Sequence, residues 1–159
     1  MTRRRAPSEG RLVLYFDGAS RGNPGPASFG VHSPSGIDIS QSIGLATNNV
    51  AEWRGFLAAL DAALASGAED VEIRADSELV LKQFLGTYRM RAPHLAPFLE
   101  EARRKASQIP RLRVVHVPRA ENRVADALAN RALDAETAAP RRAPRRPWQP
   151  ALFGLKPTR

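Results

Sequence analysis

The sequence predicts an α/β protein in which helices pack on the faces of one five-stranded mixed sheet. Three short apolar segments come first, separated by loops rich in Gly, Pro and Ser. From residue 50 onward the apolar residues recur at spacings of three and four, which is typical of helices, and two later strand patterns alternate with helical ones. Short loops favour antiparallel pairing and helical connections favour parallel crossovers, so the expected element order is βββαβααβα.

The three N-terminal strands are expected to form an antiparallel meander. Residues 12–16 are an apolar, aromatic run, and residues 27–33 are a second run that follows the breaker-rich sequence GNPGP at 22–26. After a turn at 34–36, apolar and polar residues alternate over 37–43, as in a strand with one solvated face.

The later elements alternate between helix and strand. Residues 50–66 have a helical apolar period, and Gly67 is suited to end that helix. The remaining expected elements, in chain order, are a strand at 71–75, helices at 77–85 and 95–107, a strand at 112–117 and a helix at 122–135.

Length and charge predict one folded domain between two basic ends. The chain has 159 residues, 43% of them apolar, and a formal net charge of +8. Residues 11–136 hold equal numbers of acidic and basic side chains, so the excess positive charge lies at the ends. We expect a flexible basic segment at 1–10, the folded domain at 11–136 and a basic tail rich in Pro and Arg at 137–159. The positive charge also favours a partner that carries phosphates.

Several classes of protein are excluded by composition. No apolar run approaches the roughly 18–20 residues that span a bilayer, and the Arg-rich start lacks the apolar stretch of a signal peptide. We therefore expect a cytoplasmic monomer with no membrane partner. The absence of cysteine excludes disulfides, thiolate zinc sites and a cysteine nucleophile, so oxygen or imidazole would have to hold any metal.

Two aspartates follow strands that are expected to be parallel neighbours. Asp17 comes directly after the first strand and Asp76 after the fourth, which would place both carboxylates at one sheet edge, where open α/β folds bind ligands. Each also has an ordinary explanation, because Asp17 with Gly18 could form a turn and Asp76 could cap the next helix.

Two further acids lie on expected helices. Glu52 follows Asn49 by three residues in the first turn, which is a capping-box spacing, and Asp126 could simply face solvent in the last helix. If all four acids meet, however, something must neutralise them. Mg²⁺ prefers carboxylate oxygens, and two such ions can stabilise the attacking and leaving oxygens of a phosphodiester.

Four motifs carry a resemblance to a known family. In order and spacing they resemble the motifs of type 1 ribonuclease H (RNase HI), and the match spans nearly all of residues 11–136. The motifs are DGASRGNPGPA at 17–27, TNNVAE at 47–52, ADS at 75–77 and ENRVADALA at 121–129. The resemblance implies an RNase H-like fold and an endonuclease that hydrolyses the RNA strand of RNA/DNA hybrids, leaving 5′-phosphate and 3′-hydroxyl ends.

The same resemblance implies roles for the acids. Asp17 would bridge two Mg²⁺ ions, Glu52 and Asp76 would complete one metal site, and Asp126 would complete the other, with Mn²⁺ as a possible substitute. Glu52 is also similar in position to the residue that senses the ribose 2′-hydroxyl.

Substrate contacts are implied for five polar residues, all of which could instead have turn or cap roles. Asn23 and Thr47 are similar to a pocket for a phosphate of the DNA strand, Asn48 and Asn49 to minor-groove contacts, and Ser77 to a backbone contact.

Two features depart from the family pattern. Many members carry a mobile histidine in the loop before the last helix, but here that loop is the short sequence VPRA at 117–120. Arg119 lies in this loop, and an arginine can contact phosphate without titrating near neutral pH, so we prefer it to the strand residue His116 as the group that assists product release. Residues 86–97 lack the basic, tryptophan-bearing substrate handle of some relatives, which predicts a variant without the basic protrusion.

The alternatives are another metal nuclease of the same fold, such as a resolvase or integrase, and a non-catalytic hybrid-binding module. The sequence leaves open whether double-stranded RNA is also cut. In the tail, Gln149, Leu152 and Phe153 resemble a short peptide that docks on the bacterial sliding clamp, although these apolar residues could instead cover the protein's own domain.

Overall fold

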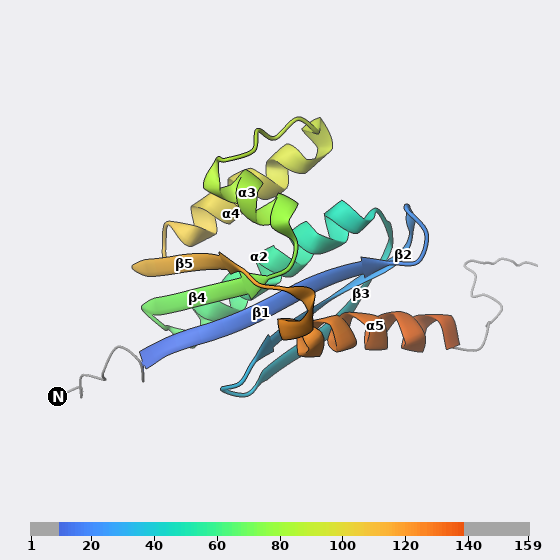
Figure 1. The fold of residues 1–159 in the computed structure, drawn as a ribbon, viewed down its shortest axis with the longest axis horizontal. Helices are drawn as coiled ribbons and strands as arrows, with labels where there is room; N and C mark the ends of the chain where they lie inside the picture. The colour runs from blue at the N-terminus through green and yellow to red at the C-terminus, as the bar shows by residue number, and fades with distance from the viewer. Residues whose placement is uncertain (1–9, 139–159) are drawn as a thin grey trace, which may run out of the picture.

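The computed structural model describes residues 10–138, and the clamp-like motif of the tail lies outside them. Five strands form one sheet, with helices on both sides (Figure 1). The strands are β1 (Arg11–Ser20), β2 (Gly25–Ser33), β3 (Ile37–Ala46), β4 (Asp70–Ala75) and β5 (Arg111–His116). The helices are α2 (Asn48–Ser66), α3 (Glu78–Leu85), α4 (Ala96–Ala106) and α5 (Arg123–Ala138), with short 3-10 helices η1 (Pro93–Leu95) and η2 (Arg119–Glu121).

The strand order is β3-β2-β1-β4-β5. β1 pairs antiparallel with β2, which pairs antiparallel with β3, whereas β1, β4 and β5 are parallel to one another. The predicted five-stranded mixed sheet and the parallel pairing of the first and fourth strands are therefore confirmed.

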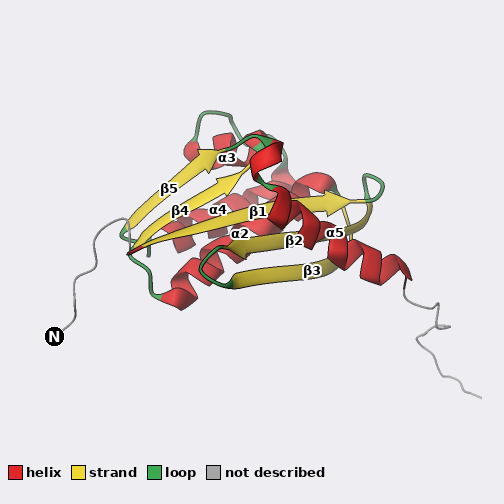
Figure 2. Cartoon of the chain, turned by 60° about the horizontal axis from the view of Figure 1, so that its bottom comes forward, coloured by secondary structure: helices red, strands yellow, loops and turns green. Residues whose placement is uncertain are grey.

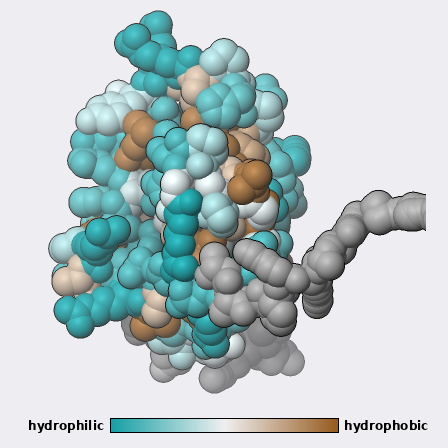
Figure 3. Space-filling view, turned by 90° about the vertical axis from the view of Figure 1, so that its right-hand side faces the viewer, coloured by the Kyte–Doolittle hydropathy of each residue, from teal (hydrophilic) through white to brown (hydrophobic). Residues whose placement is uncertain are grey.

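The two faces of the sheet are covered differently. α2 packs on one face against β1 and β2 and also contacts α4, while α5 packs on the other face against β1, β2 and β3 (Figure 2). Leu14, Phe16 and Ile73 are fully buried in the core between the sheet and α2, beside Trp53 and Phe56 of that helix. The end of the molecule at which β1 turns into β2 is mostly hydrophilic, with scattered apolar residues (Figure 3).

Several element boundaries differ from those predicted. β1 continues through four polar or small residues to Ser20, because these residues pair with β2 as far as Ala27. Asp17 therefore lies inside the strand, opposite Gly30, and does not follow it. The helix expected at 95–107 is divided into η1 and α4, and Pro97 occupies the first turn of α4. A 3-10 turn, η2, replaces part of the loop expected before the last helix.

In the part of the chain that the structure describes, no helix is both long enough and apolar enough to cross a membrane.

Candidate active site

The structure brings the four predicted carboxylates to one end of the sheet. Asp17 lies in the C-terminal half of β1, and Asp76 follows the end of the parallel neighbour β4. Glu52 projects from α2, and Asp126 lies in the first turn of α5. Parallel strands end at the same edge, so the topology itself places Asp17 and Asp76 together.

Glu52 is held by the backbone of β1. Its side chain is buried, and its Oε1 accepts a hydrogen bond of 3.0 Å from the Gly18 N–H. The predicted capping-box alternative is wrong, because α2 begins earlier than expected: Thr47 is the N-cap residue, and its hydroxyl accepts from the Val50 N–H. Glu52 consequently lies beyond the first turn and has no capping role.

Gly18 allows this contact. A Cβ at Gly18 would lie 2.4 Å from the carbonyl carbon of Ala51 and 2.4 Å from the nitrogen of Glu52, closer than real Cβ atoms approach backbone. Only glycine lets β1 and α2 come near enough for the Gly18 amide to reach the Glu52 carboxylate.

Asp76 is held from the segment before α5. The amide of Asn122 donates to Asp76 Oδ1 at 3.2 Å and to the carbonyl oxygen of Phe16 at 2.9 Å. The Arg119 Nε lies 3.6 Å from Asp76 Oδ2. Asp76 does not cap α3, whose N-cap residue is Ser77. Asn122 is 1% exposed, so it ties β4, β1 and the start of α5 together at the site.

Asp126 completes the cluster from the opposite face. Asp17 and Asp126 share a side-chain hydrogen bond, and the Asn130 amide donates to Asp126 Oδ1 at 3.2 Å. α5 can approach the sheet here because Gly30 of β2 lies beneath it, where a Cβ would be 2.4 Å from the Ala125 carbonyl oxygen. Asp126 is half-buried, so the alternative of an entirely solvent-facing charge is wrong.

Burial and mutual repulsion dominate the electrostatics. Burial, followed by the charge of Glu52 and the hydrogen bond with Asp126, raises the pKa of Asp17 to about 9. Burial and then the charge of Asp76 raise the pKa of Glu52 to about 8, although the Gly18 hydrogen bond and Arg119 oppose this shift. The four acids together carry more negative charge than the surrounding protein compensates.

A divalent cation would supply the missing positive charge, and the donor set suits a hard ion because all four groups offer carboxylate oxygens. Within residues 10–138, no three acidic or histidine side chains are positioned to ligate one ion as they stand. Protein groups contact two of the carboxylates instead: the Gly18 N–H at Glu52, and Asn122 and Arg119 at Asp76.

Three of the predicted substrate contacts meet beside this cluster. The Oδ1 of Asn23, in the β1–β2 loop, accepts a 2.9 Å hydrogen bond from the Asn48 N–H, and Thr47 precedes Asn48 at the start of α2. Asn49, the next residue of the helix, is exposed, whereas Ser77 directly follows Asp76 and is half-buried. Asn23, Thr47 and Asn48 thus lie together at the start of α2.

The two candidates for product release differ in position. His116 is the exposed last residue of β5, as predicted. Arg119 opens η2, and its side chain is 80% exposed and points to Asp76. Between α3 and η1 the described chain has no additional helix.

Asn122 and Gly18 lie within the motifs given above and Gly30 within the second expected strand, but the sequence assigns no positioning role to any of them. Asn122 directly precedes a helix, where a solvated cap is the usual expectation, so its complete burial could not be inferred. The glycines offered a weak signal, because glycine within a strand often marks a close approach of another backbone.

Comparisons with known proteins agree with this arrangement. The family model described as "Reverse transcriptase-like" matches residues 16–132. Ribonuclease HI of Halobacterium salinarum is 48% identical over 130 residues, which is 79% of this chain and 65% of that protein. A crystal structure of RNase H1 from that organism matches with a TM-score of 0.72 at 46% identity, covering 78% of this chain and 98% of the other.

Two further relatives extend the comparison. Bifunctional protein Rv2228c of Mycobacterium tuberculosis is 44% identical over 131 residues, 79% of this chain, but the chain spans only 36% of that protein's length. LC11-RNase H1 in complex with RNA/DNA hybrid matches with a TM-score of 0.71 at 35% identity, covering 80% of this chain and 99% of the other. The chain therefore belongs to the type 1 ribonuclease H (ribonuclease HI) family and has its α/β fold.

Proposed function

We propose that the protein is an endoribonuclease that hydrolyses the RNA strand of RNA/DNA hybrids and leaves 5′-phosphate and 3′-hydroxyl ends. The observation that carries this proposal is the convergence of Asp17, Glu52, Asp76 and Asp126 at one sheet end, from β1, α2, β4 and α5. A relative 35% identical to this chain has been solved with an RNA/DNA hybrid bound, which supports the same substrate.

The family implies dependence on divalent metal, and we propose two Mg²⁺ ions, with Mn²⁺ as a substitute. Asp17 would contribute to both sites, Glu52 and Asp76 to one, and Asp126 to the other. Such ions activate a water molecule and stabilise charge on the attacking and leaving oxygens of an in-line displacement.

The protein groups around the acids orient them. Asn122 fixes the Asp76 carboxylate against the backbone of β1, and the Gly18 amide fixes Glu52. Asn23 and Thr47, beside the start of α2, would hold a phosphate of the DNA strand, and Asn48 and Asn49 would reach into the minor groove. Ser77 would contact the backbone of the hybrid, and Glu52 would sense the 2′-hydroxyl.

The decisive experiment compares end-labelled RNA/DNA hybrid, duplex RNA, duplex DNA and DNA with one embedded ribonucleotide, each with Mg²⁺ or Mn²⁺. We expect cleavage of the RNA strand of the hybrid and none without divalent metal. Cleavage of duplex DNA alone would favour a resolvase-like nuclease, and binding of hybrid without any cleavage would favour a non-catalytic module. The duplex RNA arm measures whether that substrate is also cut.

Arg119→Ala is expected to lower kcat by about tenfold with little change in KM, because the exposed guanidinium lies beside Asp76 and would act on the departing phosphate. His116→Ala is the matched control at the end of β5 and should have a smaller effect. A larger fall in kcat for His116→Ala, with unchanged thermal unfolding, would assign product release to the histidine.

We also propose that the folded domain at 11–136 acts as a cytoplasmic monomer flanked by the basic segments 1–10 and 137–159.

For the tail, we propose clamp docking through Gln149, Leu152 and Phe153, with the last two residues as apolar anchors in a preformed groove. A synthetic peptide of residues 146–157 should bind purified bacterial sliding clamp, and replacing both anchors with Ala should abolish binding while hybrid cleavage and thermal stability persist. Loss of stability in the double variant of the whole protein would instead assign these residues to packing.

A further inference from the structure

Within residues 10–138, no strand pairs with the outer edge of β5. β5 is the last strand of the sheet, and its Arg111 N–H and the following Val117 N–H donate toward β4, to the carbonyl oxygens of Glu69 and Ala75. Backbone groups of alternate residues point to opposite sides of a strand. The N–H and C=O groups of Leu112 and Val114 are therefore directed away from β4, where a further strand could pair with them.

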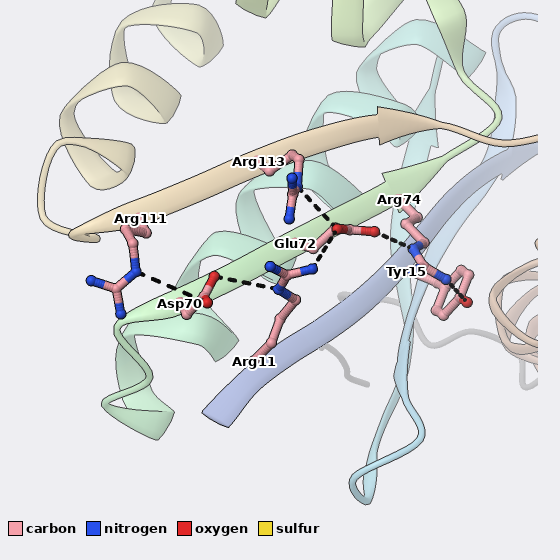
Figure 4. Close-up of polar contacts among 7 residues, drawn as sticks. All are labelled: Arg11, Tyr15, Asp70, Glu72, Arg74, Arg111 and Arg113. Atoms are coloured by element: carbon pink, nitrogen blue, oxygen red, sulfur yellow. Dashed lines mark hydrogen bonds and ion pairs between the residues drawn. The ribbon is translucent and has the colours of Figure 1, made fainter. Parts of the chain in front are cut away.

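One face beside this edge is basic. Arg11, Arg74, Arg111 and Arg113 come from three neighbouring strands and surround Asp70 and Glu72 (Figure 4). α5 packs against β1, β2 and β3, whereas the Arg111 and Arg113 side chains on β5 are 65% and 53% exposed. This half of the face is therefore open to solvent.

The two acids on this face, Asp70 and Glu72, do not neutralise all of the positive charge of the arginines around them. Burial alone would raise the pKa of Glu72, but the hydrogen bond from Arg74 and the charges of Arg74, Arg113 and Arg11 outweigh burial and lower it, so Glu72 stays ionised. Three guanidinium groups lie within 3.6 Å of its carboxylate. Asp70 has only longer contacts, of 3.5 Å to Arg11 and 3.9 Å to Arg111. Four arginines thus face two carboxylates.

Apolar side chains lie on the opposite side of the same edge, and a hollow of about 700 Å³ at β5 spans both sides. It is lined by the apolar residues Phe84, Leu85 and Pro110 and by Arg11, Arg111 and Arg113 of the basic face. Leu85 is 60% exposed at the end of α3. Within β5, Leu112 and Val114 pack against the core on this side, while Arg111 and Arg113 share the other face with Glu72.

We propose that the β5 edge binds an extended peptide segment of a partner protein in which acidic and apolar residues alternate. Successive side chains of an added strand point to opposite faces, so the acidic ones would lie over Arg111 and Arg113 and the apolar ones beside Phe84 and Leu85. A peptide also supplies both N–H and C=O groups for the unpaired edge. A nucleic acid backbone lacks the alternating N–H and C=O groups at strand spacing that would pair with this edge, which is why a peptide is the better occupant.

The test uses a fluorescein-labelled, end-blocked peptide of four Glu-Val repeats and the full chain, with binding followed by fluorescence anisotropy. We expect saturable binding in the range of tens to hundreds of micromolar. Arg111→Gln with Arg113→Gln should weaken it at least tenfold, and Leu85→Asp should do so separately. The matched control, Arg103→Gln with Arg104→Gln on the exposed side of α4, removes the same charge elsewhere and should leave binding within twofold.

Two further peptides test the backbone pairing. One peptide is N-methylated at every Glu and the other at every Val. The N–H groups of alternate residues point to opposite edges of a strand, and only one edge of an added strand faces β5. N-methylation should therefore abolish binding of one of the two peptides only. Hybrid cleavage and thermal unfolding should be unchanged in all the variants, so this inference stands apart from the proposed catalytic activity.

Several results would overturn the proposal. These are no binding at 1 mM, equal weakening by the α4 control, equal binding of a Lys-Val peptide, or displacement of the peptide by single-stranded RNA, which would assign the face to nucleic acid. Sedimentation showing a concentration-dependent dimer that the β5 variants dissociate would instead assign the edge to a second copy of this chain.

Discussion

Asp17→Asn is expected to abolish hydrolysis of the hybrid, by about a thousandfold or more in kcat, while the protein stays folded. The amide nearly matches the carboxylate in size but carries no charge, so it cannot neutralise two cations. Burial and the neighbouring Glu52 already penalise a charge at this position. Because the charged form of Asp17 is already disfavoured there without metal, a neutral amide should leave thermal stability unchanged or higher, and hybrid binding should persist.

The measurement is the rate of cleavage of labelled hybrid at saturating Mg²⁺, alongside the midpoint of thermal unfolding. Asp61→Asn is the matched control, because Asp61 is an exposed acid of α2 whose partner is Lys105, away from the four carboxylates. Activity of Asp17→Asn within tenfold of wild type would refute the assignment of Asp17 as the ligand shared by two ions.

The sequence predicts which acids lie near one another where the topology decides their proximity. Once the first and fourth strands are parallel neighbours, Asp17 and Asp76 must lie at one sheet edge, whichever partners their side chains find. The extent of β1 was harder to predict, because the pairing of Ala19 and Ser20 with β2 comes from tertiary contact and not from an apolar pattern. Local composition there is that of a turn.

Individual contacts could not be predicted in this way. The burial of Asn122 and its hydrogen bond to Asp76 depend on distances of a few ångströms between segments far apart in the chain. The N-cap of α2 is Thr47 and not Asn49, a difference of two residues that the apolar pattern does not resolve. The arginines around Glu72 carry no motif at all, and they meet only because β1, β4 and β5 align in one register.

Gly18→Ala is expected to destabilise the protein by about 1–3 kcal/mol or more, because a methyl group would enter space already filled by the backbone of α2. The atoms that this methyl group would meet belong to the backbone of Ala51 and Glu52, so no flexible side chain can move aside to make room. Moving them apart also lengthens the Gly18 N–H contact to Glu52, so kcat for hybrid cleavage should fall together with the unfolding midpoint.

Gly36→Ala is the control that separates the effect of steric overlap at Gly18 from a general loss of stability caused by backbone strain. A Cβ at Gly36 would meet nothing within 4 Å, but φ there is +117°, so this variant introduces strain of about 1–3 kcal/mol without overlap. Gly36 lies in the β2–β3 turn, far along the sheet from Glu52, so this variant should lose stability and keep its kcat at a temperature where it remains folded. If Gly18→Ala also kept its kcat under such conditions, the close approach of β1 and α2 would matter for folding alone and not for the placement of Glu52.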